Sequence, residues 1–278
     1  MYISIDLGGT KTRLALSRDL HSLDSVEKFS SLKDLKSQKE KLIDLIKPIL
    51  ETSRIEAVSI AIPGTFDLFN RRFLKVPNYK LLEGSDFNFF ADLFDSDTKL
   101  FINNDAALAC LGEAVHGAGK QYKSVAFITL STGVGGALVT GKKLYDGSKA
   151  FEPGHHILKF DDAVADNAGI FGSMESFLSG TGFKKRYGIL PEDCNDVSIW
   201  ENYGTILGAG LVNVCAFWNP DVIVLGGSLS SKYEYFLNGV TNYLNKIDGI
   251  SIAPIKKGVL EDDAGLIGGL EFISQKVA

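Results

Sequence analysis

The chain has 278 residues, of which 45% are hydrophobic and 23% charged, and its formal net charge is -5. This length and composition predict a folded globular protein with a sizeable core, and two domains more naturally than one. The negative charge argues against nonspecific nucleic-acid binding, and no apolar run approaches the length of a membrane span. The three cysteines are far apart and form no disulfide or metal-binding pattern, so we expect a reduced, cytoplasmic protein.

The first half of the chain alternates predicted strands with predicted helices. A tight turn at Gly8-Gly9-Thr10 separates an outgoing strand from a returning one. Leucine and isoleucine at helical spacing then predict an amphipathic helix, which Pro48 can kink or shorten. The predicted elements are, in chain order, strands at residues 3–5 and 14–16, a helix at 34–52, strands at 57–62 and 99–102, and a helix at 106–115.

The opening pattern recurs at residues 124–141, where a strand, a polar Gly-rich turn and a second strand follow one another. Such a repeat suggests an internal duplication and two similar lobes. A long helix is predicted at 196–218, although Gly204, Gly208 and Gly210 weaken that prediction because glycine is a poor helix former. The remaining predicted elements are a helix near 172–187, a strand within 221–230, a strand at 251–255 and a last helix from residue 263.

Strands and helices alternate along the whole chain, which predicts the α/β class. No low-complexity linker separates the two lobes, so we place their boundary at a helix junction near residue 107. The predicted N-terminal lobe comprises residues 1–107 with the C-terminal helix 265–278, and the predicted C-terminal lobe comprises residues 108–264.

Gly-rich turns follow three of the predicted strands. Glycine lets backbone N–H groups approach a phosphate closely, and neighbouring hydroxyls and a lysine add possible contacts. A single Gly-Gly turn is more often a simple hairpin connection, but three at strand ends favour nucleotide phosphates. None has the spacing of a P-loop or of a dinucleotide-binding fingerprint. The candidate phosphate-binding residues are Gly8, Gly9, Thr10, Lys11, Ser131, Thr132, Gly133, Gly135, Gly226 and Gly227.

Two aspartates lie beside these turns and strand ends. Asp6 precedes the first turn, where it can hold Mg²⁺ through water or can equally cap its own turn. Asp105 ends a predicted strand and begins a helix, so it or Asn104 can be the helix N-cap. The functional alternative is a general base that accepts the proton of an attacking hydroxyl, because ligands bind at the carboxyl ends of strands in open α/β sheets. From these residues alone, the cap is the better interpretation of Asp105.

The second half of the chain contains a sparse group of acids and imidazoles, namely Glu152, His155, His156 and Glu175. Carboxylates accept hydrogen bonds from hydroxyl groups, so this group suits a polyol. The alternative is that the acids are solvated surface residues and that each histidine is exposed or satisfied by a neighbour.

Taken together, these residues resemble the ROK family (repressors, open reading frames, kinases), within the sugar-kinase, hexokinase and actin-like superfamily. The similarity runs in order along nearly the whole chain. The segments that carry it are Asp6-Leu7-Gly8-Gly9-Thr10-Lys11, Pro63-Gly64, Asn104-Asp105-Ala106 with Gly112-Glu113, residues 129–136, Glu152-Pro153-Gly154-His155, residues 169–175, Asn219-Pro220 through Gly226-Gly227, and residues 263–268.

The resemblance implies two ribonuclease H-like lobes of the actin/hexokinase type with a cleft between them. It also implies ATP-dependent phosphorylation of a hexose or an N-acetylhexosamine, with glucose as the first candidate. Mg-ATP is expected at the Gly-rich turns, with Asp6 holding Mg²⁺ through water. Asp105 is expected to be the catalytic base that deprotonates the attacking sugar hydroxyl. The residues expected to bind the sugar are Asn104, Asp105, Glu152, His155 and Glu175.

One departure from the family concerns zinc. Typical members carry three cysteines that form a structural zinc site with the histidine that corresponds to His155. Here the cysteine positions are occupied by Asp166, Ala168 and Ser173, and tetrahedral structural zinc needs four good ligands. We therefore expect no structural zinc and a sugar-facing loop held by ordinary packing. Ser131 also stands where glycine is usual.

Two other classes of function remain open. The family includes repressors with a DNA-binding domain ahead of the first phosphate motif, but Asp6 lies five residues after Met1, so we expect no nucleic-acid partner. The stronger alternative is a nucleotide-binding protein without kinase activity, acting as a sensor or scaffold. The expected partners are a sugar and ATP, without a membrane, and a homodimer is a further possibility because family members often form dimers.

Overall fold

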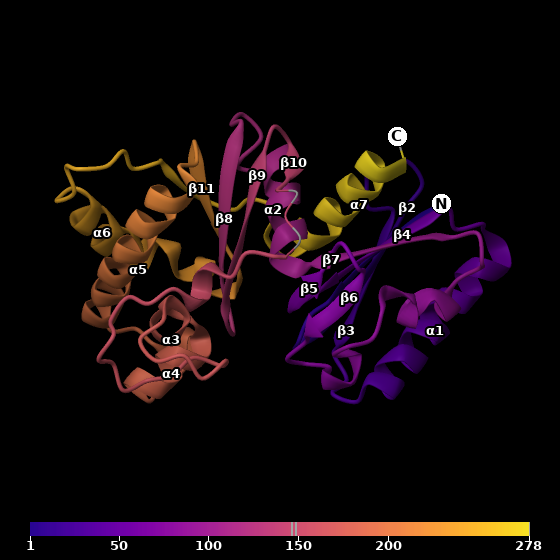
Figure 1. The fold of residues 1–278 in the computed structure, drawn as a ribbon, viewed down its shortest axis with the longest axis horizontal. Helices are drawn as coiled ribbons and strands as arrows, with labels where there is room; N and C mark the ends of the chain where they lie inside the picture. Colours follow the sequence, from indigo (N-terminus) through magenta and orange to yellow (C-terminus); the bar gives the residue numbers. More distant parts are fainter. Residues whose placement is uncertain (146, 148, 278) are drawn as a thin grey trace. The chain divides into compact units, whose positions relative to one another are not determined.

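The computed structural model describes residues 1–145, 147 and 149–277, which divide into two compact units (Figure 1). Unit 1 comprises Met1–His116, Tyr145–Ala150 and Asp262–Ala278, and unit 2 comprises Gly117–Leu144 and Phe151–Glu261. The boundary predicted near residue 107 falls inside helix α2 (Asp105–Val115), which belongs to unit 1 over its whole length. Ala278, the last residue of the predicted C-terminal helix, lies outside the described residues.

Unit 1 is built on a five-stranded sheet with the order β3-β2-β1-β4-β7. The first three strands are antiparallel neighbours, and β4 and β7 extend the sheet from β1 in parallel. The strands are β1 (Tyr2–Leu7), β2 (Lys11–Ser17), β3 (Ser25–Ser30), β4 (Ala57–Ile62) and β7 (Lys99–Asn104), and a separate small sheet joins β5 (Thr65–Asp67) to β6 (Arg72–Lys75).

Side chains that alternate along β1 face different helices. Ile3 and Ile5 share a buried core with Leu42 and Ile46 of helix α1, because residues two apart in a strand point to the same face. Helix α1 (Leu35–Thr52) runs on through Pro48, so the proline neither ends nor shortens the predicted helix. Helix α7 (Ala264–Val277) also packs on β1 and β4 (Figure 1).

Glycines set how closely helix α7 packs against the rest of unit 1. A Cβ atom on Gly269 would overlap the Ser4 hydroxyl, and a Cβ on Gly268 would overlap the Leu108 carbonyl of α2. A Cβ atom on Gly112 of α2 would likewise overlap the Ala264 carbonyl. The glycines of two family-like segments therefore have a packing role, because any side chain would force the helices apart.

Unit 2 contains a second five-stranded sheet, with the order β10-β9-β8-β11-β12. As in unit 1, the first strand in chain order pairs with an antiparallel hairpin partner on one side and with parallel strands on the other. This shared topology confirms the two similar lobes predicted from the repeated pattern. The strands are β8 (Ser124–Leu130), β9 (Val134–Thr140), β10 (Lys143–Leu144), β11 (Val222–Gly226) and β12 (Ile255–Lys257).

The helices of unit 2 are α3 (Met174–Leu178), α4 (Gly180–Tyr187), α5 (Val197–Trp218) and α6 (Tyr233–Leu244). The predicted helix near 172–187 is in fact two helices, because Ser179 adopts an extended conformation and caps α4. The long predicted helix is confirmed as α5, and its glycines are packing sites. Gly204 lies against the backbone of α6, and Gly210 lies against the side chain of Met174. Short 3-10 segments are η1 (Lys80–Leu82), η2 (Phe87–Leu93), η3 (Pro153–His155), η4 (Pro191–Asp193), η5 (Ser228–Lys232) and η6 (Glu261–Asp263).

The last strand differs from its prediction. It was predicted at residues 251–255, whereas β12 spans Ile255–Lys257. Pro254 has no N–H to donate, and its carbonyl only accepts a hydrogen bond from Ile223, so the regular ladder begins after it.

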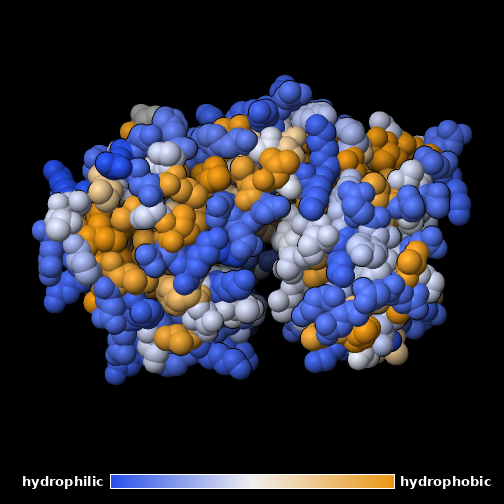
Figure 2. Space-filling view, turned by 180° about the vertical axis from the view of Figure 1, so that it is seen from behind, coloured by the Kyte–Doolittle hydropathy of each residue, from blue (hydrophilic) through white to orange (hydrophobic). Residues whose placement is uncertain are grey.

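Hydrophilic residues cover much of the visible surface of both units, with hydrophobic residues in patches among them (Figure 2). Within the part of the chain that the structure describes, no helix combines the length and the hydropathy that a membrane crossing requires.

The packing of α5 on α6 can be tested by Gly204→Ala. The new Cβ would overlap the backbone carbonyl of Phe236, which cannot move aside as a flexible side chain could. Alanine gains about 1 kcal/mol in helix propensity, but we expect overpacking to dominate and to lower the free energy of unfolding by about 1–3 kcal/mol in urea denaturation. The control is Gly249→Ala, where no atom lies within 4 Å of the new Cβ. An unchanged unfolding midpoint for Gly204→Ala would contradict this packing.

Candidate functional site

The first Gly-rich turn connects β1 to β2 and leaves Gly9, Thr10 and Lys11 exposed. A Cβ atom on Gly8 would lie 2.7 Å from the Lys11 carbonyl oxygen, so the turn is too tight for a larger residue. A Cβ on Gly9 would lie 2.5 Å from Nδ2 of Asn78, which places that side-chain amide against the turn. The predicted turn residues are thus accessible to a ligand from solvent.

A polar network behind this turn holds its shape. The Ser31 hydroxyl donates to the Gly8 carbonyl at 2.6 Å, and the Ser31 amide donates to the Thr10 carbonyl at 2.9 Å. Thr12 Oγ1 lies 2.8 Å from Ser31 Oγ and accepts a hydrogen bond from Gln38 Nε2 at 3.0 Å. This network was not predicted from the sequence, although a glutamine on the apolar stripe of a predicted helix was a usable signal.

Asp6 does not cap the first turn, because it pairs with Arg13 across the β1–β2 hairpin. Arg13 Nη1 lies 2.9 Å from Asp6 Oδ2, and Arg13 Nη2 lies 2.8 Å from Asp262 Oδ2. Burial raises the pKa of Asp6, and the Arg13 guanidinium opposes that shift without cancelling it. The sequence analysis missed both partners, although the hairpin register, which sets Asp6 opposite Arg13, follows from the turn position.

Asn104, and not Asp105, is the N-cap of α2. Its Oδ1 accepts the Ala107 amide at 3.1 Å, and its Nδ2 donates to the Gly64 carbonyl at 2.9 Å. Asp105 is the first residue of the helix, half-buried at the carboxyl end of β7, and its Oδ1 accepts the Ala106 amide at 2.9 Å. The alternative that Asp105 serves as the helix cap is therefore wrong.

The second Gly-rich turn, Ser131–Gly133, connects β8 to β9 and is held by helices α3 and α4. The Ser131 carbonyl accepts the Gly180 amide at 2.7 Å, and the Thr132 carbonyl accepts the Thr181 hydroxyl at 3.0 Å. A Cβ on Gly133 would lie 2.6 Å from Glu175 Oε2. Any other residue at position 133 would require the Glu175 carboxylate to move.

The third Gly-rich turn lies beside the second, because β8 and β11 are parallel neighbours. Gly226 is the last residue of β11 and packs on the ring of Phe127. Gly227 has a φ of 84°, and its Cβ position is filled by the Leu130 carbonyl. Gly135, which was grouped with the second turn, is instead part of β9, opposite Thr129.

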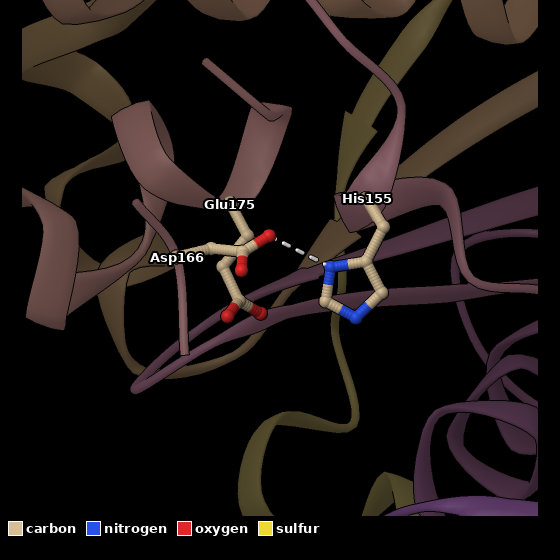
Figure 3. Close-up of side chains that lie close together, drawn as sticks. All are labelled: His155, Asp166 and Glu175. Carbon is tan, nitrogen blue, oxygen red and sulfur yellow. Dashed lines mark hydrogen bonds and ion pairs between the residues drawn. The ribbon is translucent and has the colours of Figure 1, made fainter. Parts of the chain in front are cut away.

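Two of the predicted sugar-binding residues of unit 2, His155 and Glu175, lie close together with Asp166 beside them (Figure 3). His155 Nε2 lies 3.9 Å from Glu152 Oε2. His155, Asp166 and Glu175 each offer an N or O atom within 4.8 Å of the other two. Glu175 is buried, and its Oε2 and Oε1 accept the amides of Val134 at 2.9 Å and Asn167 at 3.1 Å. The alternative that Glu175 is a solvated surface acid is therefore wrong.

Asp166 holds the loop between η3 and α3 by hydrogen bonds, rather than the ordinary packing that the sequence analysis expected. Its Oδ2 accepts from Ser173 Oγ at 2.6 Å and from His155 Nδ1 at 2.9 Å. Its Oδ1 accepts from the amides of Ala168 and Ile170, both at 2.9 Å. Burial alone would raise the pKa of Asp166, but the hydrogen bonds from Ser173, Ile170 and His155 outweigh it and hold that pKa below its usual value.

These residues do not fit a closed structural zinc site. His155, Asp166 and Glu175 are three potential ligands rather than four, and their oxygens already accept hydrogen bonds from the protein. A metal ion would have to displace the His155–Asp166 hydrogen bond to use Nδ1. The expectation of no structural zinc stays a prediction.

The chain matches the model of the ROK family over residues 2–276. It belongs to the ROK family. A curated glucokinase of Halalkalibacterium halodurans is 28% identical over 224 residues, which are 66% of this chain and 67% of the relative. The N-acetylgalactosamine kinase AgaK of Shewanella sp. is 29% identical over 271 residues, covering 84% of this chain and 83% of the relative. A xylose repressor of Bacillus spizizenii is 26% identical over 66% of this chain, which spans 51% of that repressor.

Solved structures of the family share the fold of this ROK protein. A ROK glucokinase from Streptomyces griseus, determined in complex with glucose and AMPPNP, matches with a TM-score of 0.82 over 99% of both chains at 23% identity. This match confirms the predicted α/β fold of the actin/hexokinase type.

Glu152 offers a test of how the charges of Glu152, His155 and Glu175 affect stability. Burial and the nearby Glu175 raise the pKa of Glu152, and His155 opposes them only in part. The folded state therefore holds this proton more tightly than the unfolded chain, so stability is lost as the pH rises through the folded pKa. We expect Glu152→Gln to raise the free energy of unfolding at pH 7, with the gain vanishing toward the ordinary glutamate pKa of about 4.3.

Urea denaturation at several pH values measures this gain. Glu27→Gln, at an exposed position of β3, is the matched control and should show no comparable gain at pH 7. A Glu152→Gln variant that is less stable than the wild type at pH 7 would show that the charge of Glu152 stabilises the fold.

Proposed function

We propose that this ROK protein is an ATP-dependent sugar kinase that phosphorylates a hexose or an N-acetylhexosamine, with glucose as the first candidate. The observation that carries the proposal is the position of Asp105, the first residue of α2, directly after the carboxyl end of β7. Asn104 is the N-cap of this helix, and the Asp105 carboxylate also accepts the Ala106 amide. Ligands of open α/β sheets bind at such strand ends.

The proposed sugar ligands are Asn104 and Asp105 of unit 1 and Glu152, His155 and Glu175 of unit 2. The clustering of the last three supports the assignment, since carboxylates and an imidazole accept hydroxyl hydrogen bonds. The raised pKa of Glu152 also supports this assignment, because carboxylates whose burial costs stability are found preferentially at functional sites.

The proposed ATP-binding residues lie at the three Gly-rich turns. Close contacts at both glycines, with the Lys11 carbonyl at Gly8 and the Glu175 carboxylate at Gly133, support phosphate binding at turns that leave little room for a Cβ atom. Asp6 is proposed to hold Mg²⁺ through water, although Arg13 already shares its charge. The full proposed set is Asp6, Gly8, Gly9, Thr10, Lys11, Ser131, Thr132, Gly133, Gly135, Gly226 and Gly227.

In the proposed reaction, Asp105 accepts the proton of a sugar hydroxyl as that oxygen attacks the γ-phosphorus of ATP. The bond between the γ-phosphorus and the β,γ-bridging oxygen breaks, and ADP leaves with that electron pair. Phosphoryl transfer requires chiefly positioning and charge neutralisation. The backbone amides and Lys11 are proposed to supply the positive charge, and Mg²⁺ supplies further neutralisation of the phosphates when bound.

Asp105→Asn tests the proposed base. The amide cannot accept the proton, so we expect kcat to fall by about 10²–10⁴ while nucleotide binding, measured by calorimetry, is retained. The Asn104 cap stays in place, so the fold should be intact. Asp44→Asn, an exposed change on α1, is the control for the loss of one negative charge. Wild-type turnover in Asp105→Asn would eliminate it as the base.

A panel of sugars in a coupled ADP-release assay tests the activity itself. Glucose, N-acetylglucosamine and N-acetylgalactosamine are the first members, because kinases of similar sequence bear the names glucokinase, N-acetyl-D-glucosamine kinase and N-acetylgalactosamine kinase. We expect sugar-dependent ADP release with at least one of them. Nucleotide binding without ADP release on any sugar would favour a sensor or scaffold instead.

A further inference from the structure

The carboxylate of Asp166 is fully buried, with a side chain that is 0% exposed, yet it lies in contact with the half-buried ring of His155 (Figure 3). An isolated buried carboxylate would be strongly disfavoured, and this one is stabilised by hydrogen bonds from Ser173 Oγ and the amides of Ala168 and Ile170. Its place in the fold is therefore rigid, and so is the orientation of the imidazole ring that it binds.

The direction of the His155–Asp166 hydrogen bond follows from the charge of the carboxylate. Asp166 has a pKa below its usual value, so it is ionised near neutral pH and can only accept. Nδ1 of His155, at 2.9 Å from Oδ2, must then carry the proton. In a neutral ring this leaves Nε2 as an acceptor, since the two ring nitrogens take opposite roles.

We propose that Asp166 is a positioning residue that fixes His155 in the Nδ1–H tautomer, so that Nε2 accepts a hydrogen bond from a hydroxyl of the sugar. The tautomer rests on the hydrogen bonds around Asp166 and on its negative charge, and the use of the tautomer rests on the proposed kinase function. Nε2 lies on the side of Glu152, whose Oε2 is 3.9 Å away, so the ring and this carboxyl can share one polyol. Without Asp166, the ring could exchange its proton between the two nitrogens and rotate.

The same carboxylate also orders the loop beside Glu175. The amide of Asn167, the residue after Asp166, donates to Glu175 Oε1 at 3.1 Å. Asp166 thus links His155 and the Glu175 segment without a metal ion. A bound metal is the competing organiser, but the hydrogen bonds from Ser173, Ala168 and Ile170 already satisfy the oxygens that it would need.

The first experiment measures the tautomer by NMR of the full chain with ¹⁵N-labelled histidine, in the absence of sugar. The chain has four histidines, and His155→Gln identifies the signal that belongs to position 155. We expect a protonated Nδ1 and an unprotonated Nε2 in the wild type at neutral pH. A protonated Nε2 with a bare Nδ1 at position 155 would overturn the proposal, whether or not Asp166→Asn folds.

Asp166→Asn is the second step, and Asp162→Asn is its matched control. Asp162 lies in the same loop and pairs with Arg186, whose Nη2 donates to Asp162 Oδ1 at 2.6 Å. We expect Asp166→Asn to shift the His155 signals toward the Nε2–H form, whereas Asp162→Asn lowers stability and leaves the tautomer unchanged. The same shift in both variants would reduce the role of Asp166 to general loop stability.

Steady-state kinetics then test whether the tautomer matters for the sugar. For the sugar that is active with the wild type, Asp166→Asn should raise the KM by roughly 3- to 10-fold, the value of one hydrogen bond, and leave the KM for ATP unchanged. An unchanged sugar KM, with the tautomer shifted, would overturn the proposed use of Nε2. Absence of ADP release with every sugar would instead contradict the kinase function and leave the NMR result standing.

Elemental analysis of the purified chain tests whether a bound metal, rather than Asp166, orients His155. We expect the wild-type tautomer in protein that contains less than a stoichiometric amount of zinc or another transition metal. One tightly bound equivalent that is lost in Asp166→Asn would overturn the proposal in favour of a metal site.

Discussion

Close contacts around the glycines at strand ends are the constraint on which the candidate sites depend. The space for a Cβ atom at Gly8 is filled by the Lys11 carbonyl, at Gly133 by Glu175 and at Gly227 by the Leu130 carbonyl. A turn this tight excludes every other residue, and it leaves main-chain amides as the groups nearest to a ligand. Each turn is also held to another element, so the packed core determines its shape.

Buried or half-buried carboxylates are the second feature of this arrangement, and each is stabilised differently. Asp6 pairs with the guanidinium of Arg13, Glu175 accepts two backbone amides, and Asp166 accepts a hydroxyl, an imidazole and two amides. Burial of a charge is costly unless such partners are present. Because the partners are already in place, these groups are preorganised rather than dependent on a ligand for their positions.

Much of the secondary structure could be predicted from local pattern. The strand at 57–62 and the helix at 34–52 agree closely with β4 and α1, because a continuous apolar run and a helical stripe are local signals. The break at Ser179 could not be predicted from the sequence. The Ser179 side chain accepts the Gly182 amide as the N-cap of α4, but in the sequence this residue looks like any serine within a helix. Strand β3 was also missed, because its burial pattern is mostly exposed and it lies at a sheet edge.

By itself, the sequence determined the family, the duplicated strand–turn–strand pattern and the identities of the candidate site residues, because motifs and hydrophobic periods are properties of neighbouring residues. Only the tertiary structure decided that Asn104 rather than Asp105 caps α2, that Asp262 pairs with Arg13, and that Asp166 binds His155. The physical reason is that two side chains form a hydrogen bond or an ion pair only when they are close in space. The packing of strands and helices sets that distance, and sequence separation does not.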